Sequence, residues 1–410
     1  MLLWIAFFIA SLGPLISAAY LVKDSGLDDV FLYHEWVRHG FETGIWPVVD
    51  EPWVYPIGAL VPMALLSFIA SASTYLVAWW GMIVAINAFT LIRIRDNLPN
   101  GYRAAWWWVA FLLCLGPSAI GRIDAVAAAA ATFALVSFYR RPKLAATLIT
   151  LAGWIKVIHF AWLLPLFLIS TKRVHNVLAP ALLSSILVVG VELALGSGTR
   201  IFGFLTGQTR RGLQAESIFA TPFSVARLWK DGMGPTYNEP LNTYEYLGEA
   251  ASTTARVLDL LLIIAAIVVA QLVLLAHRRR HLQQLQLVAL ATFAMTLALI
   301  VFNKVGSPQF TLWLAAPLVL SFATKSVPQT VISWRFPLIG VLAVAALTQL
   351  IYPLAYRSYI LGSPTMVFVG AIRNVLVVAL LAWAVRKLYE ASRPVIKNRT
   401  RASIPLAAPE

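Results

Sequence analysis

Apolar runs of helix length recur along nearly the whole chain, and this feature limits the possible folds more than any other. The chain is 60% hydrophobic and 12% charged, whereas soluble globular proteins carry about 25% charged residues. The apolar runs are continuous rather than alternating, which excludes an outer-membrane β-barrel. The sequence therefore predicts an all-α protein with many membrane-spanning helices.

The positions of Lys and Arg predict the orientation of these helices, because cytoplasmic loops are enriched in both residues. One alternating path of about 12 crossings places every basic cluster on the cytoplasmic side, together with both termini. That side holds 19 of the 32 basic residues and 3 of the 18 acids, a net +16. The charge therefore reflects orientation and attraction to anionic lipid, not nucleic-acid binding. The predicted crossings are 2–22, 74–92, 104–119, 122–139, 144–155, 157–170, 177–196, 256–276, 283–302, 309–323, 336–351 and 365–385.

The domain organisation follows from the same map. Residues 1–386 form one integral membrane domain, and 387–410 form a basic cytoplasmic tail. The apolar segment 57–71 breaks the alternation if it crosses fully, so we expect a half-depth helix there. Two outer loops, 23–55 and 197–255, are long, and long loops without strong structure of their own are usually functional. The chemistry is therefore expected on the outer side.

Acidic residues are concentrated in the first outer loop. Residues 23–55 hold 7 of the 18 acids, and Asp28 and Asp29 are adjacent. Neighbouring carboxylates beside an apolar surface repel each other and are partly desolvated, which raises a pKa toward that of a general base near neutral pH. Carboxylate oxygens also bind divalent cations. The pair is interpreted as a general base, as a Mg²⁺ or Mn²⁺ ligand, or as a solvated acidic loop.

Charged residues also stand at predicted helix ends. Arg122 and Asp124 share one end, either as functional groups at membrane depth or as a pair that closes a helix hairpin. Lys156 and His159 lie where the two short helices 144–155 and 157–170 meet. Lys156 suits a phosphate as a point charge, or its ammonium group extends to the membrane surface. His159 alone is more typical of a core histidine.

Further polar residues fall on the same predicted side. Arg210 and Arg211 precede Gln214 and Glu216 in the second loop, where arginine forks suit phosphate oxygens or the loop faces lipid headgroups. The chain has no GxSxG, HExxH, phosphate-binding P-loop or dinucleotide fingerprint. The remaining candidates are Lys304 and Gln309, the aromatic residues Tyr33, Trp36, Trp53, Tyr55, Tyr352 and Tyr356, and Arg373, which is expected deeper in the last helix.

Several short motifs occur in a recognisable order. Asp29 precedes Tyr33 by four residues in "DVFLY", and "GIWPVVD" (44–50) and "YPIGAL" (55–60) follow. This order resembles the first outer loop of glycosyltransferase family 87, and "GRID", "WIKV", "RRGLQAES" and "NKVGSPQF" resemble later blocks of that family. The resemblance spans about residues 20–375. The chain departs at Ile57, where the family usually has a second proline, and in "IHF" after "WIKV"; neither change affects an acid or base.

The resemblance implies the C-type membrane glycosyltransferase fold and the activity of polyprenol-phosphate-mannose-dependent α-mannosyltransferases or related arabinofuranosyltransferases of actinobacteria. The sugar moves, with inversion, from a polyprenyl monophosphate to a glycolipid or polysaccharide acceptor at the outer face of the cytoplasmic membrane. Asp29 is implied as the general base, with Asp28 second. No cofactor is required, and Mg²⁺ or Mn²⁺ stays an alternative. The implied substrate-binding residues are Arg122, Asp124, Lys156, His159, Arg210, Arg211, Gln214, Glu216, Lys304 and Gln309, and the implied sugar or acceptor aromatics are Tyr33, Trp36, Trp53 and Tyr55.

Three other classes of protein are alternatives to a membrane glycosyltransferase. A secondary transporter or flippase has broken helices at mid-membrane and often repeated halves, but no clear internal repeat is visible and the polar residues cluster outside. An O-antigen ligase or polymerase has a large outer loop but is expected to lack the acidic first loop. A scaffold needs no charges directed at one cavity. The sugar itself, mannose or arabinofuranose, is not determined by these residues.

Overall fold

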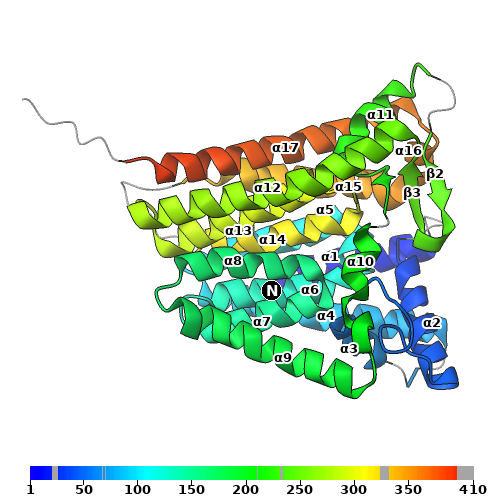
Figure 1. Ribbon diagram of the computed structural model, residues 1–410, viewed down its shortest axis with the longest axis horizontal. Coiled ribbons are helices and arrows are strands. Elements are labelled where there is room, and N and C mark those ends of the chain that lie inside the picture. The colour runs from blue at the N-terminus through cyan, green and yellow to red at the C-terminus, as the bar shows by residue number, and fades with distance from the viewer. Residues whose placement is uncertain are drawn as a thin grey trace, which may run out of the picture.

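A bundle of helices with a small sheet at one end makes up the molecule (Figure 1). The structure is a computed structural model, and it describes residues 1–20, 26–66, 68–69, 71–209, 211–230, 234–323 and 332–394. A helix lies in each of the twelve predicted ranges. These bundle helices are α1 (Leu2–Tyr20), α4 (Ala72–Asn97), α5 (Gly101–Leu115), α6 (Asp124–Ser137), α7 (Pro142–Ile155), α8 (Phe160–Ile169), α9 (Ala179–Ala194), α12 (Glu249–Arg279), α13 (Gln284–Val301), α14 (Ala315–Ser321), α15 (Arg335–Gln349) and α17 (Pro364–Ser392).

Fewer than twelve of these helices are long and apolar enough to cross a membrane. Among the described residues, 6 helices are long and apolar enough, and this is consistent with an all-α membrane protein. Helix α17 continues to Ser392, beyond the predicted domain boundary at residue 386. The tail from residue 395 lies outside the described residues. The qualifying segments are Ala72–Asn97, Val174–Ala194, Glu249–Arg279, Gln284–Val301, Arg335–Leu354 and Pro364–Ser392.

The two ends of the bundle differ in structure. At one end, the loop end, Figure 1 shows several short helices and the strands together, while the α12–α13 junction and the end of α17 lie at the opposite, basic end. The short helices of the loop end are α2 (Asp28–Thr43), α3 (Leu60–Ala64), α10 (Gly203–Thr209), α11 (Thr221–Ala226) and α16 (Tyr356–Ile360). The 3₁₀ helices are η1 (Ile57–Ala59), η2 (Gly116–Ala119), η3 (Val157–His159), η5 (Gly198–Phe202), η6 (Ile218–Ala220), η7 (Glu239–Leu241) and η8 (Pro308–Leu314), and the π-helices are η4 (Val174–Leu178) and η9 (Leu350–Leu354).

A small antiparallel sheet corrects the all-α prediction locally. Strands β1 (Leu213–Gln214), β3 (Thr243–Tyr246) and β2 (Thr236–Asn238) pair in that spatial order. Leu213 lies opposite Tyr246, and Thr236 lies opposite Glu245. Strands of two to four residues are too short to show the alternation by which a strand is recognised in sequence. The second outer loop is therefore more structured than expected.

Helix α2 shows why part of the first outer loop is ordered. Its buried residues include Val30, Tyr33, Val37 and Gly40, a spacing that forms one face of a helix. Gly44 ends the helix in the left-handed conformation, with φ 76°, which glycine adopts without a steric cost. The acids on the opposite face led to the prediction of a loop rather than a helix in this segment. Folding it as a helix gives Asp28 and Asp29 defined positions in its first turn.

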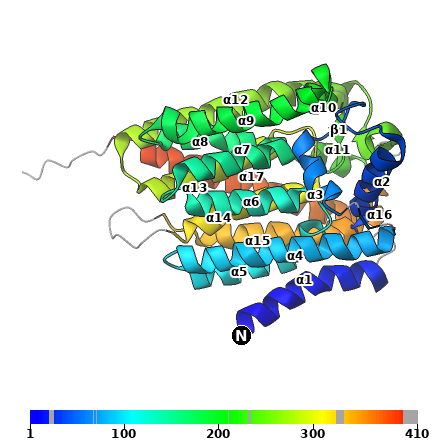
Figure 2. The ribbon, with the colours of Figure 1, turned by 90° about the horizontal axis from the view of Figure 1, so that it is seen from below.

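The core of the bundle is centred on α13, and other helices surround it. Helix α13 is buried along nearly its whole length and contacts α8, α12, α14 and α17. Helix α9 has one buried residue, Glu192, and Figure 2 shows α9 and α12 along the same outer side of the bundle. The segment 57–71, predicted as a half-depth helix, holds the short η1 and α3 at the loop end.

Candidate functional site

Two ion pairs meet at the loop end of the bundle. Arg122, in the turn before α6, pairs with Asp29 in the first turn of α2. Asp124, two residues further on, pairs with Lys156 at the end of α7, with 3.3 Å between Nζ and Oδ2. Arg122 and Asp124 therefore do not form the pair that would simply close a helix hairpin. Each takes its partner from a segment that is distant in sequence.

The two carboxylates differ in how far a substrate can reach them. The Asp29 side chain is 20% exposed, whereas that of Asp124 is fully buried. Asp124 also accepts a hydrogen bond of 2.7 Å from the indole nitrogen of Trp313 in η8. The sequence did not identify Trp313 as a site residue, since a tryptophan in an apolar run is typical of a core residue. Asp124 is thus a fixed structural anion beside Lys156, and Asp29 is the accessible carboxylate.

Backbone contacts hold the Arg122 turn against α2. A Cβ at Gly121 would lie 2.6 Å from the carbonyl oxygen of Gly26, so only glycine allows this close approach. The backbone N–H of Ile123 donates to the Tyr33 hydroxyl at 3.1 Å. On the other side of the turn, Trp79 donates to the carbonyl of Ile120 at 2.9 Å. These contacts fix where the Arg122 guanidinium meets Asp29.

Aromatic rings cover both cations. The Lys156 ammonium lies 4.7 Å from the centroid of the Tyr55 ring, and Arg122 lies 5.2 Å from that of Tyr352 and donates to its hydroxyl. A ring face attracts a cation, more strongly where water is excluded. Burial raises the pKa of Tyr55, Lys156 lowers it, and Asp29, Asp124 and Arg122 act on it too. All four charges therefore lie within electrostatic reach of one phenol.

The predicted sugar aromatics occupy two different environments. Trp36, Trp53 and Tyr55 form a cluster of edge-to-face rings with centroids 5.2 to 6.2 Å apart. Tyr33 is fully buried and packs on Trp79 at 5.1 Å, so its ring has no free face for a sugar. Burial raises the pKa of Tyr33, which keeps it a neutral phenol. Tyr33 orders the Arg122 turn instead of stacking on a ligand.

The second outer loop meets the "NKVGSPQF" segment at close range. A Cβ at Gly306 would lie 2.2 Å from the backbone between Glu216 and Ser217. The Gly306 N–H donates to the Gln214 side-chain oxygen at 3.1 Å, and the Gln214 N–H donates to the Lys304 carbonyl at 3.0 Å. The predicted residues Gln214, Glu216 and Lys304 are therefore brought together through their backbones.

Glu216 extends this network toward the Arg122 pair. Burial raises the pKa of the Glu216 carboxyl, and a hydrogen bond from Tyr356 and the charge of Arg373 oppose this shift. The Tyr356 ring lies 5.0 Å from that of Tyr352, which accepts the hydrogen bond from Arg122. A continuous set of polar and aromatic side chains thus joins the second outer loop to the Arg122 turn.

Other predicted residues have partners besides the charged groups of the two ion pairs. Lys304 is buried and pairs with Asp259 of α12 at 2.8 Å, a partner that the sequence did not suggest. His159 is fully buried, with a ring nitrogen 3.1 Å from the Lys156 carbonyl oxygen. Gln309 is buried and its side-chain oxygen accepts from Ser307. Arg210 lies outside the described residues.

Arg211 stands apart from these pairs. Burial lowers the pKa of its guanidinium, while Tyr55 and Glu245 raise it. Its charge therefore acts on the same tyrosine that covers Lys156. No ion pair of Arg211 is present in the part of the chain that the structure describes. Arg211 is the predicted phosphate-binding arginine of the second outer loop that is described, and it shares Tyr55 as an electrostatic neighbour with Lys156.

A divalent cation would need several oxygen or nitrogen ligands. Across the described ranges, no group of three or more His, Cys, Asp or Glu residues is placed to hold a metal ion. Asp29 is already engaged by the Arg122 guanidinium. A metal ion at Asp28 and Asp29 would therefore compete with a cation that the protein supplies itself.

Known proteins add no assignment to this geometry. No protein-family model matches the chain, and no curated protein matches its sequence. The likeness to glycosyltransferase family 87 therefore depends on the motifs in the sequence.

Proposed function

We propose that this chain is a membrane glycosyltransferase. It moves a sugar, mannose in the first instance, from a polyprenyl monophosphate to a lipid or glycan acceptor at the outer face of the cytoplasmic membrane. The observation that carries the proposal is the accessible carboxylate of Asp29 beside Arg122, with Lys156 held nearby on Asp124. A base and two cations are the groups that transfer from a phosphate donor requires.

The Arg122–Asp29 pair suggests how the donor prepares the site. A phosphate offers oxygens that match the guanidinium fork, so it competes with Asp29 for Arg122. Once Arg122 binds the phosphate, Asp29 is free to accept the proton of the acceptor hydroxyl. The acceptor oxygen forms the new bond to the anomeric carbon while the bond from that carbon to the phosphate oxygen breaks. Arg122 and Lys156 then stabilise the charge on the departing polyprenyl phosphate, and the configuration inverts.

The membrane topology forms part of the proposal. Twelve crossings in a C-type glycosyltransferase arrangement, with both termini in the cytoplasm, are supported by the twelve bundle helices and by the separation of the loop end from the basic end (Figure 1). Arg278, Arg279 and Arg280 stand at the α12–α13 junction of the basic end. An excess of positive charge marks the cytoplasmic side. The candidate site then faces outward.

Transfer by the purified full-length protein tests the proposal. The protein in detergent receives a radiolabelled polyprenyl-phosphate mannose and, in a parallel reaction, the arabinofuranose analogue, each with a glycolipid acceptor. Labelled glycolipid together with free polyprenyl phosphate supports the proposal, and the preferred donor identifies the sugar. In proteoliposomes, translocation of an intact lipid-linked sugar without transfer would contradict the enzyme and favour a flippase.

A further inference from the structure

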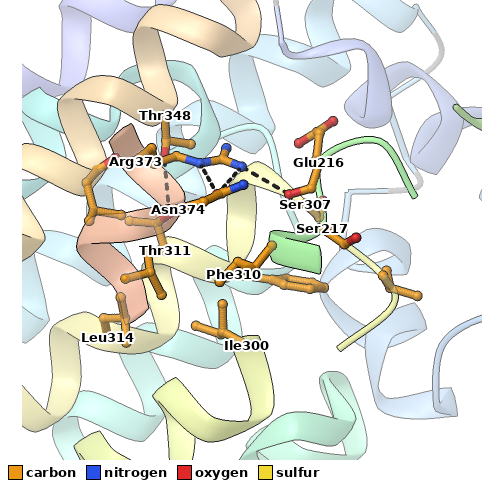
Figure 3. Close-up of a pocket in the computed structure, with 15 residues that line it drawn as sticks. Glu216, Ser217, Ile300, Ser307, Phe310, Thr311, Leu314, Thr348, Arg373 and Asn374 are labelled. Carbon is orange, nitrogen blue, oxygen red and sulfur yellow. Dashed lines mark hydrogen bonds between the residues drawn. The ribbon is translucent and has the colours of Figure 1, made fainter. Parts of the chain in front are cut away.

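A cavity of about 40 Å³ lies beside the second outer loop, and Arg122 is not among the residues that line it (Figure 3). It is bounded by α13, η8, α15 and α17, and the loop segment at Glu216 and Ser217 closes one side. Its wall mixes apolar side chains, among them Phe310 and Leu314, with polar ones. The polar side chains of the wall include Arg373, Asn374, Thr311, Thr348 and Glu216.

Arg373 is the basic residue of this wall, and its hydrogen bonds go to neutral acceptors. The residue is 7% exposed. It donates from Nε and one Nη to the Asn374 side-chain oxygen at 3.1 and 2.9 Å, and from that Nη to the Glu216 carbonyl at 3.0 Å (Figure 3). These acceptors are neutral, and within the described ranges no carboxylate forms an ion pair with Arg373. A desolvated cation without a counterion is unfavourable.

Glu216 lies in the same wall but forms no ion pair with Arg373 in the part of the chain that the structure describes. Its carboxyl group takes a hydrogen bond from Tyr356. Burial raises the pKa of this carboxyl group, and the charge of Arg373 opposes that shift. The second Nη of Arg373 also forms no hydrogen bond to the described residues. The guanidinium thus keeps two N–H donors for a ligand.

Neutral donors surround the same space. Asn374 uses one amide N–H on Thr221 at 2.7 Å, which leaves its second N–H. The hydroxyl of Thr348 donates to the Val344 carbonyl, and that of Thr311 lies 3.4 Å from it (Figure 3). A water molecule needs about 10–15 Å³ of such volume, so the cavity holds about three waters or one group of similar size.

We propose that this cavity binds a compact oxyanion, a phosphate or carboxylate group, through Arg373 with Asn374 and Thr311. The apolar wall excludes water, which strengthens the attraction between the guanidinium and an anion. The Thr311 hydroxyl and the amide of Asn374 supply neutral hydrogen bonds. This site differs from the Arg122–Asp29 and Lys156–Asp124 ion pairs and does not depend on glycosyl transfer.

Thermal unfolding of the full-length protein in a neutral detergent tests the site. Inorganic phosphate is titrated at constant ionic strength with chloride as the reference, and the wild type is expected to show a saturable rise in Tm. Parallel titrations with acetate and with a short-chain phosphatidate distinguish a carboxylate, a free phosphate and a lipid headgroup by which ligand acts at the lowest concentration. A Tm that follows ionic strength alone would overturn the proposal.

Variants separate this cavity from other anion sites. Arg373→Gln is expected to abolish the phosphate response. Because Arg373 also holds the Glu216 carbonyl, Thr311→Val serves as a second variant that leaves this contact intact and is expected to weaken phosphate binding several-fold. Arg357→Gln removes an exposed arginine of α16 and is expected to keep the response. A response that survives in Arg373→Gln and disappears in Arg122→Gln would assign the anion to the Arg122 turn and overturn the proposal.

Discussion

Arg122, in the turn before α6, pairs with Asp29 of α2, although Asp124 stands two residues away in the chain. Asp124 in turn pairs with Lys156. This exchange joins α2, α6 and α7 at the loop end and leaves one carboxylate of the four groups accessible. The arrangement therefore has a buried carboxylate, Asp124, which holds Lys156 in place, and an accessible one, Asp29, which pairs with Arg122.

The Lys156–Asp124 ion pair predicts a large effect on stability. Lys156→Met leaves the fully buried Asp124 without its cation, and breaking a buried pair in this way costs about 3–5 kcal/mol. The double variant Lys156→Met/Asp124→Asn removes both charges and is expected to recover much of that loss. Unfolding free energies from detergent titration of the two variants check this. Equal losses in both would show that the pair does not hold the site together.

The contact of Gly306 with the second outer loop predicts a steric effect. Gly306→Ala places a methyl group 2.2 Å from the backbone at Glu216 and Ser217, so the loop must move. We expect a loss of stability of about 1–3 kcal/mol, as for other overpacked positions. Gly207→Ala is the matched control, because nothing lies within 4 Å of its Cβ position. Melting temperatures of both variants measure the difference, and an equal response would contradict the tight crossing.

Glu216 predicts a pH dependence of stability. Burial raises its pKa above the ordinary 4.5 in the folded protein, so the folded state binds more protons than the unfolded state above pH 4.5. Its contribution to stability is therefore fully present below pH 4.5 and is lost as the pH rises through the folded pKa. The Tm of the wild type minus the Tm of Glu216→Gln should decrease as the pH rises through the folded pKa. An increase of this value with pH would mean that the folded protein stabilises the carboxylate as an anion.

The proposed orientation predicts which loops a membrane-impermeant reagent reaches. Cys114 is the one cysteine of the chain, so Cys114→Ser provides a background for single cysteines. In intact cells a maleimide is expected to label Glu35→Cys, which is exposed on α2, and to label Arg141→Cys only after permeabilisation. The reverse pattern would place the candidate site on the cytoplasmic side.

Continuous apolar runs predicted much of the bundle, because runs such as those of α12 and α17 are set by local composition. They did not predict the sheet, whose strands have too few residues to alternate. They also missed α2, since Asp28, Asp29 and Glu35 lie on the exposed part of a helix whose other face is buried.

The candidate residues were easier to identify than their partners. A charge in an apolar chain is visible in sequence, so Asp29, Arg122, Asp124 and Lys156 were all expected at the outer side. Their pairing depends on three-dimensional packing, which also brought in Trp313. Lys304 was predicted to bind the phosphate, but in the structure it forms an ion pair with Asp259. In the sequence, Asp259 is an isolated acid within a long apolar run.

Sugar transfer by Asp29→Asn tests the central claim most directly. The amide keeps the shape of the side chain but cannot accept the proton, so we expect the rate to fall by about 10²–10⁴-fold. Glu35→Gln, an exposed acid on the same helix, is the control and should keep wild-type transfer. Both variants must match the wild type in expression and Tm. Wild-type rates in Asp29→Asn would contradict the assignment of Asp29 as the base.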